Sequence, residues 1–396
     1  MLKPLKVLPL TSLRFFAAMY VVGYHTVDRV FTHCKDLSTV HGRLFDLGYI
    51  AVSFFFTLSG YILAVSYLPR RVSKRQFWWA RFARIYPLFL LTLLVDAPQY
   101  LVGVAKQIGY PSAVPVLIEK VIGNMLLLQA WAPAMRSMDW PNWSLSVEAF
   151  FYLLFPFLLT RIARLKTPVL AAAGALSYAG GMGVVTAALH SQASLDVLKF
   201  NPLFHLHAFI CGTLLGAIRI RSRLVPLYAP AFLCVAIACF TLVVHFYRYL
   251  PLPLIHDGLL VPAFVCLILA FDSGNRTMDA LLSMKGLVVL GEASYGLYLI
   301  HIPLWHVFYH LRIDQSKVAY PLYLACAVAL SVLSFFYVET PLRRLLADRG
   351  GVFAPRLSRA PRITEPGDLS TEQPPLTLSR IGAATNLDDP AISTAT

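Results

Sequence analysis

Charged residues are scarce in this chain of 396 residues, where Asp, Glu, Lys and Arg together make up 14%. A soluble domain carries roughly a quarter charged residues, so the composition excludes an ordinary soluble fold. Hydrophobic residues reach 58% and gather in runs of about 20, the length at which a helix crosses the hydrocarbon core of a bilayer. The alternation of a membrane barrel strand is missing as well. Because backbone groups in lipid find only internal partners, these runs predict membrane-spanning helices.

Cysteine is sparse too, with six residues in the whole chain. Cys34 lies in a predicted loop and the other five lie in apolar runs. Their spacing matches neither a disulfide framework nor a metal motif, and it is typical of small core residues. We therefore expect no disulfide bonds and no bound metal.

Acidic residues number 20 against 34 Lys and Arg, which gives a net charge of +14 at pH 7. Blocks of positive charge can indicate a nucleic-acid partner. Most of these cationic residues, however, lie in short loops between hydrophobic runs, where they set the orientation of helices in a membrane. The charge therefore predicts membrane topology, with the lipid bilayer as a partner and no nucleic acid.

The apolar runs predict an all-α, polytopic membrane protein of about ten transmembrane helices. With the N-terminus in the cytoplasm, nineteen cationic residues fall on the inner side and ten in outer loops, which favours both termini inside. The predicted spans cover residues 8–30, 47–67, 83–103, 143–160, 168–188, 203–219, 228–247, 256–272, 287–310 and 319–340.

Two segments stand apart from these spans. Residues 114–132 are apolar, but counting them as a span would invert every later loop, so we expect a re-entrant or interfacial helix on the outer side. Residues 350–396 change to Pro, Ser, Thr, Gly and scattered charge, a composition that cannot bury enough apolar surface to fold. The predicted organisation is a membrane domain at 1–349 and a disordered cytoplasmic tail at 350–396.

The first predicted span carries Arg14 and His25, and ionisable groups inside a membrane are functional candidates because they are costly there. They are eleven residues apart, which places them on one helix face about 16 Å apart along the axis. Arg14 falls in the inner half of the membrane, where it can meet an anionic group from the cytoplasm. His25 falls in the outer half, where its imidazole can act as a base near neutral pH. A snorkelling Arg and a buried structural His are the alternatives.

The second span contains Ser59 and Gly60. A Ser-Gly pair in mid-membrane indicates close helix packing more often than catalysis, because Gly lets backbones approach and Ser bonds across helices. We also include both in a predicted donor-binding set with Arg81 and Arg84, which are three residues apart at the start of the third span. A positive-inside bias alone explains such a pair. The functional alternative is an Arg fork whose aromatic neighbours suit the phosphates and adenine of coenzyme A.

Two further ionisable residues fall within spans four and nine. Glu148 follows Ser144 by four residues, so it is either a carboxylate favoured by the helix dipole or a functional acid. It is predicted in the outer third of the membrane. His301 lies about 20 Å along the ninth span, also in the outer half. We therefore expect His25, Glu148 and His301 at one depth, above the arginines of the inner side.

Six strings in this order make the chain resemble the acyltransferase 3 family of membrane O-acyltransferases. The match covers most of residues 8–345. The strings are Leu13-Arg14 through His25, Phe54–Tyr61, the group Arg81, Arg84 and Pro87, Trp143–Tyr152, Ser294–His301, and Val338–Pro341.

The resemblance implies ten or so helices in a bacterial inner membrane and a cytoplasmic acyl-CoA donor. It implies an acceptor reached from the outer side, such as a polysaccharide, a lipopolysaccharide, a lipo-oligosaccharide or a small secondary metabolite. It further implies that Arg14 and His25 are the essential pair and that Arg81 and Arg84 bind the donor.

The sequence therefore predicts O-acyl transfer, with acetyl-CoA as donor and a hydroxyl of a surface polysaccharide, a lipopolysaccharide or a lipid-linked saccharide as acceptor. His25 either takes the hydroxyl proton or forms a transient acyl-imidazole, and Glu148 or His301 orients it. The alternative is a proton-coupled transporter or flippase of a surface-glycan precursor, since intramembrane His, Glu and Arg also serve proton relays. Transporters usually carry inverted repeats, which this sequence does not show, and they have no need of the arginine pair.

Overall fold

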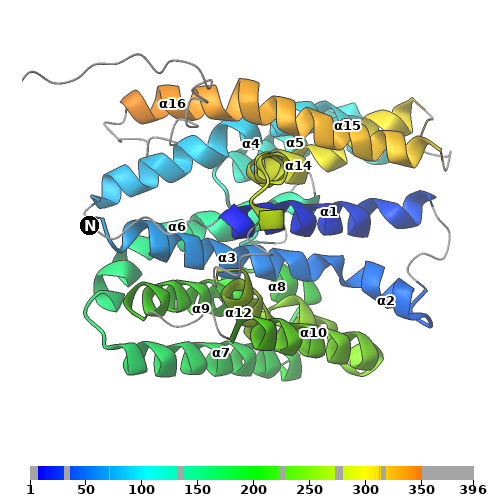
Figure 1. The fold of residues 1–396 in the computed structure, drawn as a ribbon. Helices are drawn as coiled ribbons and strands as arrows, with labels where there is room; N and C mark the ends of the chain where they lie inside the picture. The colour runs from blue at the N-terminus through cyan, green and yellow to red at the C-terminus, as the bar shows by residue number, and fades with distance from the viewer. Residues whose placement is uncertain are drawn as a thin grey trace, which may run out of the picture. The chain divides into compact units, whose positions relative to one another are not determined.

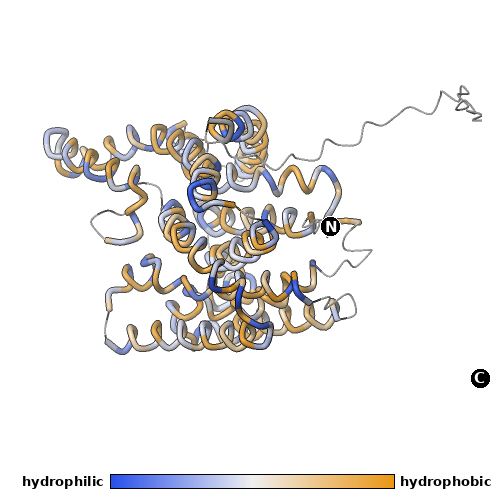
Figure 2. Tube along the Cα trace, turned by 90° about the vertical axis from the view of Figure 1, so that its left-hand side faces the viewer, coloured by the Kyte–Doolittle hydropathy of each residue, from blue (hydrophilic) through white to orange (hydrophobic). Residues whose placement is uncertain are grey.

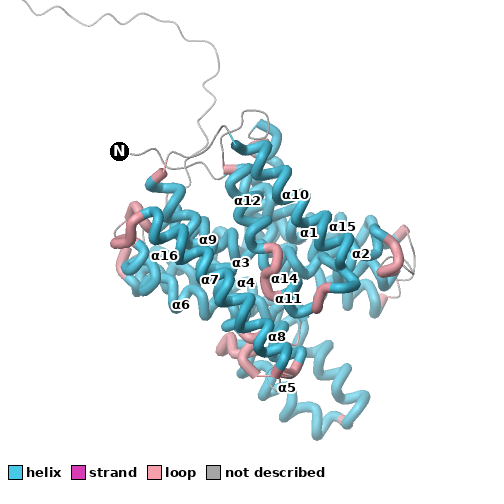
Figure 3. Tube along the Cα trace, turned by 90° about the horizontal axis from the view of Figure 1, so that it is seen from below, coloured by secondary structure: helices cyan, strands magenta, loops and turns pink. Residues whose placement is uncertain are grey.

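The computed structural model describes most of the membrane domain. Every regular element among the described residues is a helix, which Figure 3 shows by colour. The prediction of an all-α fold is therefore confirmed, whereas the predicted tail at 350–396 lies outside the described residues. The described ranges are 8–30, 36–70, 72–132, 135, 138, 140–191, 193–222, 228–272, 280–311, 313 and 318–349.

The helices follow one another with short connections, and Figure 1 labels most of them. The first half of the chain contains α1 (Leu8–Val30), α2 (Val40–Asp46), η1 (Leu47–Tyr49), α3 (Ile50–Tyr67), α4 (Lys74–Ile108), α5 (Tyr110–Met125), η3 (Trp140–Asn142), α6 (Trp143–Ile162) and α7 (Thr167–His190). The second half contains α8 (Leu195–Phe200), α9 (Pro202–Arg221), α10 (Ala229–Phe246), η5 (Tyr247–Tyr249), α11 (Leu252–His256), α12 (Val261–Phe271), α14 (Lys285–His310), α15 (Ala319–Ser334), a π-helical turn η6 (Phe335–Glu339) and α16 (Thr340–Arg349).

Nine helical segments in the described ranges are long and apolar enough to cross a membrane. They correspond to nine of the ten predicted spans, and hydrophobic residues run along them in Figure 2. The exception is the first predicted span, which forms the 23-residue helix α1 but does not belong to this set. Arg14, His25 and several other polar residues lower its hydropathy. Helix α1 packs along α14 and against α3 (Figure 1), so protein surrounds much of its surface.

Glycines set the two closest helix pairs, α1 with α14 and α3 with α9. A Cβ on Gly291 of α14 would lie 2.0 Å from the carbonyl oxygen of Thr11 in α1. On the other pair, a Cβ on Gly60 would lie 2.2 Å from the carbonyl oxygen of Phe209, and one on Gly212 would lie 1.8 Å from that of Thr57. Only glycine permits such backbone contact, so these positions fix the spacing of the helices.

The apolar stretch at 114–132 does not form a full span. Helix α5 follows α4 after a turn at Gly109, whose φ of 79° suits glycine. It has 16 residues and is not among the nine segments. Val114, Ile118 and Ile122 are exposed at helical spacing along it. A helix is therefore present within the predicted stretch, but it ends at Met125, before residue 132, and its position relative to the membrane stays a prediction.

An aromatic core joins α3, α4, α6 and α9 behind the candidate site. The rings of Phe151 and Phe209 stack with centroids 4.8 Å apart, and those of Phe77 and Phe155 stack 5.0 Å apart. Offset ring pairs at such distances stabilise packing beyond the area that they bury. This core holds the first turns of α4 and the middle of α6 in fixed positions.

Candidate active site

One cavity brings together residues from α1, α3, α4, α6 and α14. It contains about 1170 Å³ of empty space, including the part that opens outward. Its polar lining combines three arginines, two carboxylates and several hydroxyls, against a wall of Phe, Leu, Ile and Val side chains. The polar residues are Thr11, Arg14, Ser59, Arg81, Arg84, Ser144, Glu148, Tyr152, Glu292, Ser294, Tyr295 and Tyr298.

Arg81 is held by aromatic rings. Its guanidinium carbon lies 5.8 Å from the ring centroids of Tyr67 and Tyr152 and 6.0 Å from that of Phe77. It donates one hydrogen bond, of 3.4 Å, to the Tyr67 hydroxyl, while its buried Nε has no hydrogen-bond partner among the described residues. Rings can hold a guanidinium without using its donors. Its donors therefore remain available for an anionic ligand that enters the cavity.

Helix α4 presents Arg84 to the same cavity, one turn beyond Arg81, and α1 presents Arg14. The negative charges of Glu148 and Glu292 act on both of these arginines. The residues that line the cavity thus include three guanidinium groups and two carboxylates, which leaves a positive excess in the lining. Such a site attracts an anion, because the low dielectric of a helix bundle strengthens each charge interaction.

Glu148 is fixed by hydroxyl groups. Tyr152, one turn further along α6, donates a very short hydrogen bond to the Glu148 Oε1, and Ser59 of α3 donates another of 3.2 Å to the same oxygen. These contacts place the carboxylate beside Tyr152, in a lining that also contains the arginines. Its depth in the membrane, which we predicted to match that of the two histidines, stays a prediction.

His25 of α1 and His301 of α14 lie against each other, with ring centroids 5.3 Å apart. The Nδ1 of His301 is 2.7 Å from the carbonyl oxygen of Tyr298, which can only accept, so Nδ1 carries the proton. In the neutral ring, Nε2 of His301 then accepts from Nδ1 of His25, at 3.1 Å. This leaves the lone pair of His25 on Nε2. Of the two residues predicted to orient His25, His301 is the one that contacts it, and this contact favours one tautomer of a neutral His25.

Tyr298 connects the histidine pair with the cavity. Its side chain lines the cavity, its ring centroid lies 6.0 Å from that of His301, and its hydroxyl is 2.7 Å from the Ser144 Oγ. His25 and His301 themselves are not among the lining residues. Phe55 also lines the cavity and packs 6.3 Å from Tyr298. These two aromatic side chains therefore mark the end of the cavity nearest to the histidines.

The predicted residues fall into three groups. Six belong to one connected region: Arg14, Ser59, Arg81, Arg84 and Glu148 line the cavity, and His301 bonds the backbone of the lining residue Tyr298. His25 joins them through His301. Gly60 does not face the cavity, because it forms the close contact with α9. Its placement matches the packing interpretation of the Ser-Gly pair.

Sequence reasoning missed two carboxylates of this region. Glu292 lines the cavity beside Arg14. Glu339 lies in the π-helical turn η6, its charge acts on Arg84, and its buried Oε1 has no hydrogen-bond partner in the described part of the chain. The criterion that selected Glu148, an ionisable residue inside a predicted span, would also have selected Glu292, which lies in the predicted span 287–310. Glu339 was assigned only to the end of the last span.

Comparisons with known proteins show the family to which this chain belongs. The acyltransferase domain model of the acyltransferase 3 family matches residues 10–339. Acyltransferase MdmB of Streptomyces mycarofaciens is 30% identical over 395 residues, covering 90% of this chain and 97% of that protein. The peptidoglycan O-acetyltransferase OatA of Listeria monocytogenes is 27% identical, covering 84% of this chain, and the O-acetyltransferase OatA of Staphylococcus aureus is 22% identical, covering 85%.

The chain spans 55% and 57% of the length of these two OatA proteins, whereas it spans nearly all of MdmB. No solved structure matches it significantly. The matched region contains every element that lines the cavity and both histidines. The chain therefore belongs to the acyltransferase 3 family, and it is an integral membrane acyltransferase.

Proposed function

We propose that this enzyme moves an acetyl group from acetyl-CoA, bound from the cytoplasmic side, to a hydroxyl of a surface glycan. The observation that carries the proposal is the arginine-lined cavity, which reaches through Tyr298 to the His25–His301 pair. A polysaccharide, a lipopolysaccharide and a lipid-linked saccharide are the acceptor classes proposed. Peptidoglycan is a further proposed acceptor, because one relative is named a peptidoglycan O-acetyltransferase. We further propose a bacterial inner membrane, with both termini in the cytoplasm.

The donor end of the site is the arginine cluster. Coenzyme A carries several phosphate charges, and guanidinium groups bind phosphate oxygens with two parallel hydrogen bonds. Arg81 is suited to this role because the rings of Tyr67, Phe77 and Tyr152 hold it while its Nε has no protein partner among the described residues. We assign the phosphates to Arg81 and Arg84 and the pantetheine or thioester end to Arg14.

The chemical step is assigned to His25. Its Nε2 lone pair takes the proton from the acceptor hydroxyl as that oxygen attacks the thioester carbonyl carbon. The carbon–sulfur bond then breaks, the coenzyme A sulfur leaves as the thiolate and receives the proton from His25, and the ester and free coenzyme A result. His301 holds the His25 ring, because its Nε2 accepts a hydrogen bond of 3.1 Å from the Nδ1 of His25. In this assignment Glu148 shapes the donor cavity through Ser59 and Tyr152.

The side chains of Phe55 and Tyr298 stand at the end of the cavity nearest to the histidines. Delivery of the thioester to His25 therefore requires these side chains to turn aside when substrates bind. Rotamer changes of this kind are common in enzymes that exclude water until both substrates are present. In this proposal, the two rings limit hydrolysis of acetyl-CoA in the absence of an acceptor.

The test uses full-length protein in proteoliposomes, with acetyl-CoA that carries a radioactive acetyl group and with membranes that contain surface glycan. We expect release of free coenzyme A together with label in an alkali-labile ester on the glycan. The His25→Ala variant should insert normally and transfer acetyl groups about 10²–10⁴-fold more slowly. Movement of a labelled glycan precursor across the vesicle membrane, without ester formation or release of coenzyme A, would support the transporter alternative and reject acyl transfer. Mass spectrometry of glycan O-acetylation in cells with and without the protein identifies the acceptor.

A further inference from the structure

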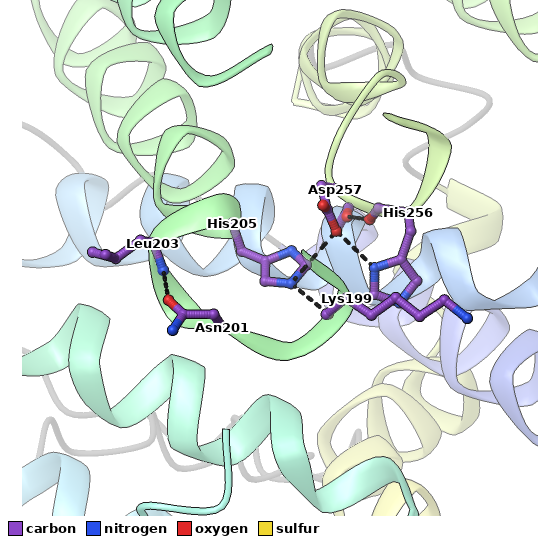
Figure 4. Close-up of polar contacts among 7 residues, drawn as sticks. Lys199, Asn201, Leu203, His205, His256 and Asp257 are labelled. Carbon is purple, nitrogen blue, oxygen red and sulfur yellow. Dashed lines mark hydrogen bonds and ion pairs between the residues drawn. The ribbon is translucent and has the colours of Figure 1, made fainter. Parts of the chain in front are cut away.

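A second group of polar side chains lies away from the cavity, among α8, α9 and α11. It consists of His205, His256 and Asp257, and Figure 4 shows the carboxylate of Asp257 between the two histidine rings. The three side chains are buried, with residue exposures of 1%, 8% and 0%. Their ligand-type atoms all lie within 4.8 Å of one another. Nothing in the proposed acyl transfer uses this group.

Asp257 carries a carboxylate that the protein does not fully satisfy. Its Oδ1 is 2.8 Å from the Nδ1 of His256 and 3.8 Å from the Nε2 of His205. Its Oδ2 is buried and has no hydrogen-bond partner in the described part of the chain. No Lys or Arg of the described residues forms an ion pair with it. A buried carboxylate without a compensating cation is costly, so this arrangement calls for a positive charge.

The donor atoms match a divalent transition metal in kind and spacing. Two imidazole nitrogens and one carboxylate oxygen form a typical zinc ligand set, with bonds of about 2.0–2.2 Å, so tetrahedral ligands lie about 3.3 Å apart. Two of the observed separations, 2.8 and 3.8 Å, bracket that value, and all three lie within 4.8 Å. The carbonyl oxygen of Lys199 lies 2.9 Å from the Nε2 of His205, so this nitrogen gives up its proton and its hydrogen bond to Lys199 when it binds the ion.

Packing around the group fixes its geometry. The Trp143 ring lies 5.1 Å from the ring of His205 and 5.5 Å from that of His256, and Tyr49 stacks on His256 at 5.4 Å. Directly after Asp257, the chain turns at Gly258 with a φ of 117°. Only glycine adopts this conformation readily, and a Cβ there would also meet the His207 ring at 2.6 Å. Buried ligands on fixed backbones are typical of a structural metal site, which stays closed to solvent.

We propose that His205, His256 and Asp257 bind one divalent transition metal ion of the Zn²⁺ type. The ion ties the α8–α9 corner to the end of α11. It lies next to Trp143, whose neighbour Ser144 lines the active-site cavity. The spacing of the cysteines predicted no bound metal, whereas the ligands of this site are two histidines and an aspartate from two distant parts of the chain. The site is independent of the proposed acyl transfer, so either proposal can fail alone.

The first experiment measures metal by mass spectrometry in tag-free protein, purified in detergent and dialysed against a weak chelator. We expect about one zinc per chain. His205→Ala and Asp257→Asn should each lower the content at least tenfold. His190→Ala, which removes an exposed histidine of α7, is the matched control and should keep the full content.

The second experiment uses wild-type protein only, so its result does not depend on whether a variant folds. Wild-type protein stripped with a strong chelator should lose thermal stability and regain it with Zn²⁺. Reloading with Co²⁺ should produce the visible absorption bands of a tetrahedral nitrogen–oxygen site. Metal content equal in wild type and variants, or stripped protein with unchanged stability and no Co²⁺ bands, would overturn the proposal. In that case a protonated histidine balances Asp257 instead.

Discussion

Helix α3 has two contrasting faces. On one face, Ser59 and Phe55 line the cavity, together with helices that supply three arginines. On the other face, Gly60 touches the backbone of α9, and Ser53 donates a hydrogen bond of 2.9 Å to the carbonyl of His256 in the closed histidine–aspartate group. On the cavity face, polar atoms such as the Arg81 Nε have no protein partner among the described residues, whereas on the opposite face Ser53 is hydrogen-bonded to the protein. The first face therefore suits the binding of a ligand, and the second suits helix packing.

The largest effect is expected from His25→Ala, which tests the active-site face. Loss of a general base lowers the rate by about 10²–10⁴-fold. Acetyl transfer from acetyl-CoA should fall by this factor, with unchanged insertion and thermal stability. His190→Ala is the control, because His190 is exposed on α7, far along the chain from α1. Wild-type rates in the His25 variant would show that the histidine pair only packs α1 against α14.

Arg81→Ala is expected to act mainly on donor binding. Hydrogen bonds to charged groups contribute about 1.5–3 kcal/mol, so the KM for acetyl-CoA should rise about 10–100-fold. Arg81→Lys should recover only part of this loss, because lysine keeps the charge but not the fork. Steady-state kinetics check both values. The control is Arg164→Ala, which removes an exposed cation outside the cavity; an equal rise there would indicate a general charge effect.

Gly60→Ala tests the sealed face of α3. The new Cβ would lie 2.2 Å from the Phe209 carbonyl oxygen, so α3 and α9 must separate. Overpacking of this kind costs about 1–3 kcal/mol. We expect a lower thermal unfolding midpoint with a nearly unchanged KM for acetyl-CoA in the folded fraction. An Ala variant as stable as wild type would mean that the two helices are not in close contact at this position.

Ser59→Ala, at the neighbouring residue, should affect activity and not stability, and its effect on activity should be the smallest of those predicted here. It removes the 3.2 Å hydrogen bond to the Glu148 Oε1 but leaves the bond from Tyr152 in place. A single neutral hydrogen-bond donor contributes about 1 kcal/mol, so we expect kcat/KM to fall five- to tenfold at unchanged stability. If Ser59→Ala destabilised the protein as much as Gly60→Ala, the two faces of α3 would not differ in function.

Much of the fold followed from local sequence. Nine predicted spans coincide with helices long and apolar enough to cross a membrane, because hydropathy and helix length depend only on neighbouring residues. The positions of Arg14 and His25 along α1 followed in the same way. The hydrogen bond from Ser59 to Glu148 did not, because it depends on how α3 packs against α6. Glu292 was missed although it satisfied the same local criterion.

The sequence alone determined the helical, membrane-embedded character of this protein and its membership of an acyltransferase family, because both depend on composition and on short strings in order. Only the tertiary structure decided which residues meet. It brought His25 to His301, Ser59 to Glu148, and His205 to Asp257 across long stretches of chain. The physical reason is that lateral packing of helices depends on contacts such as Gly291 against Thr11, which involve two distant segments at once.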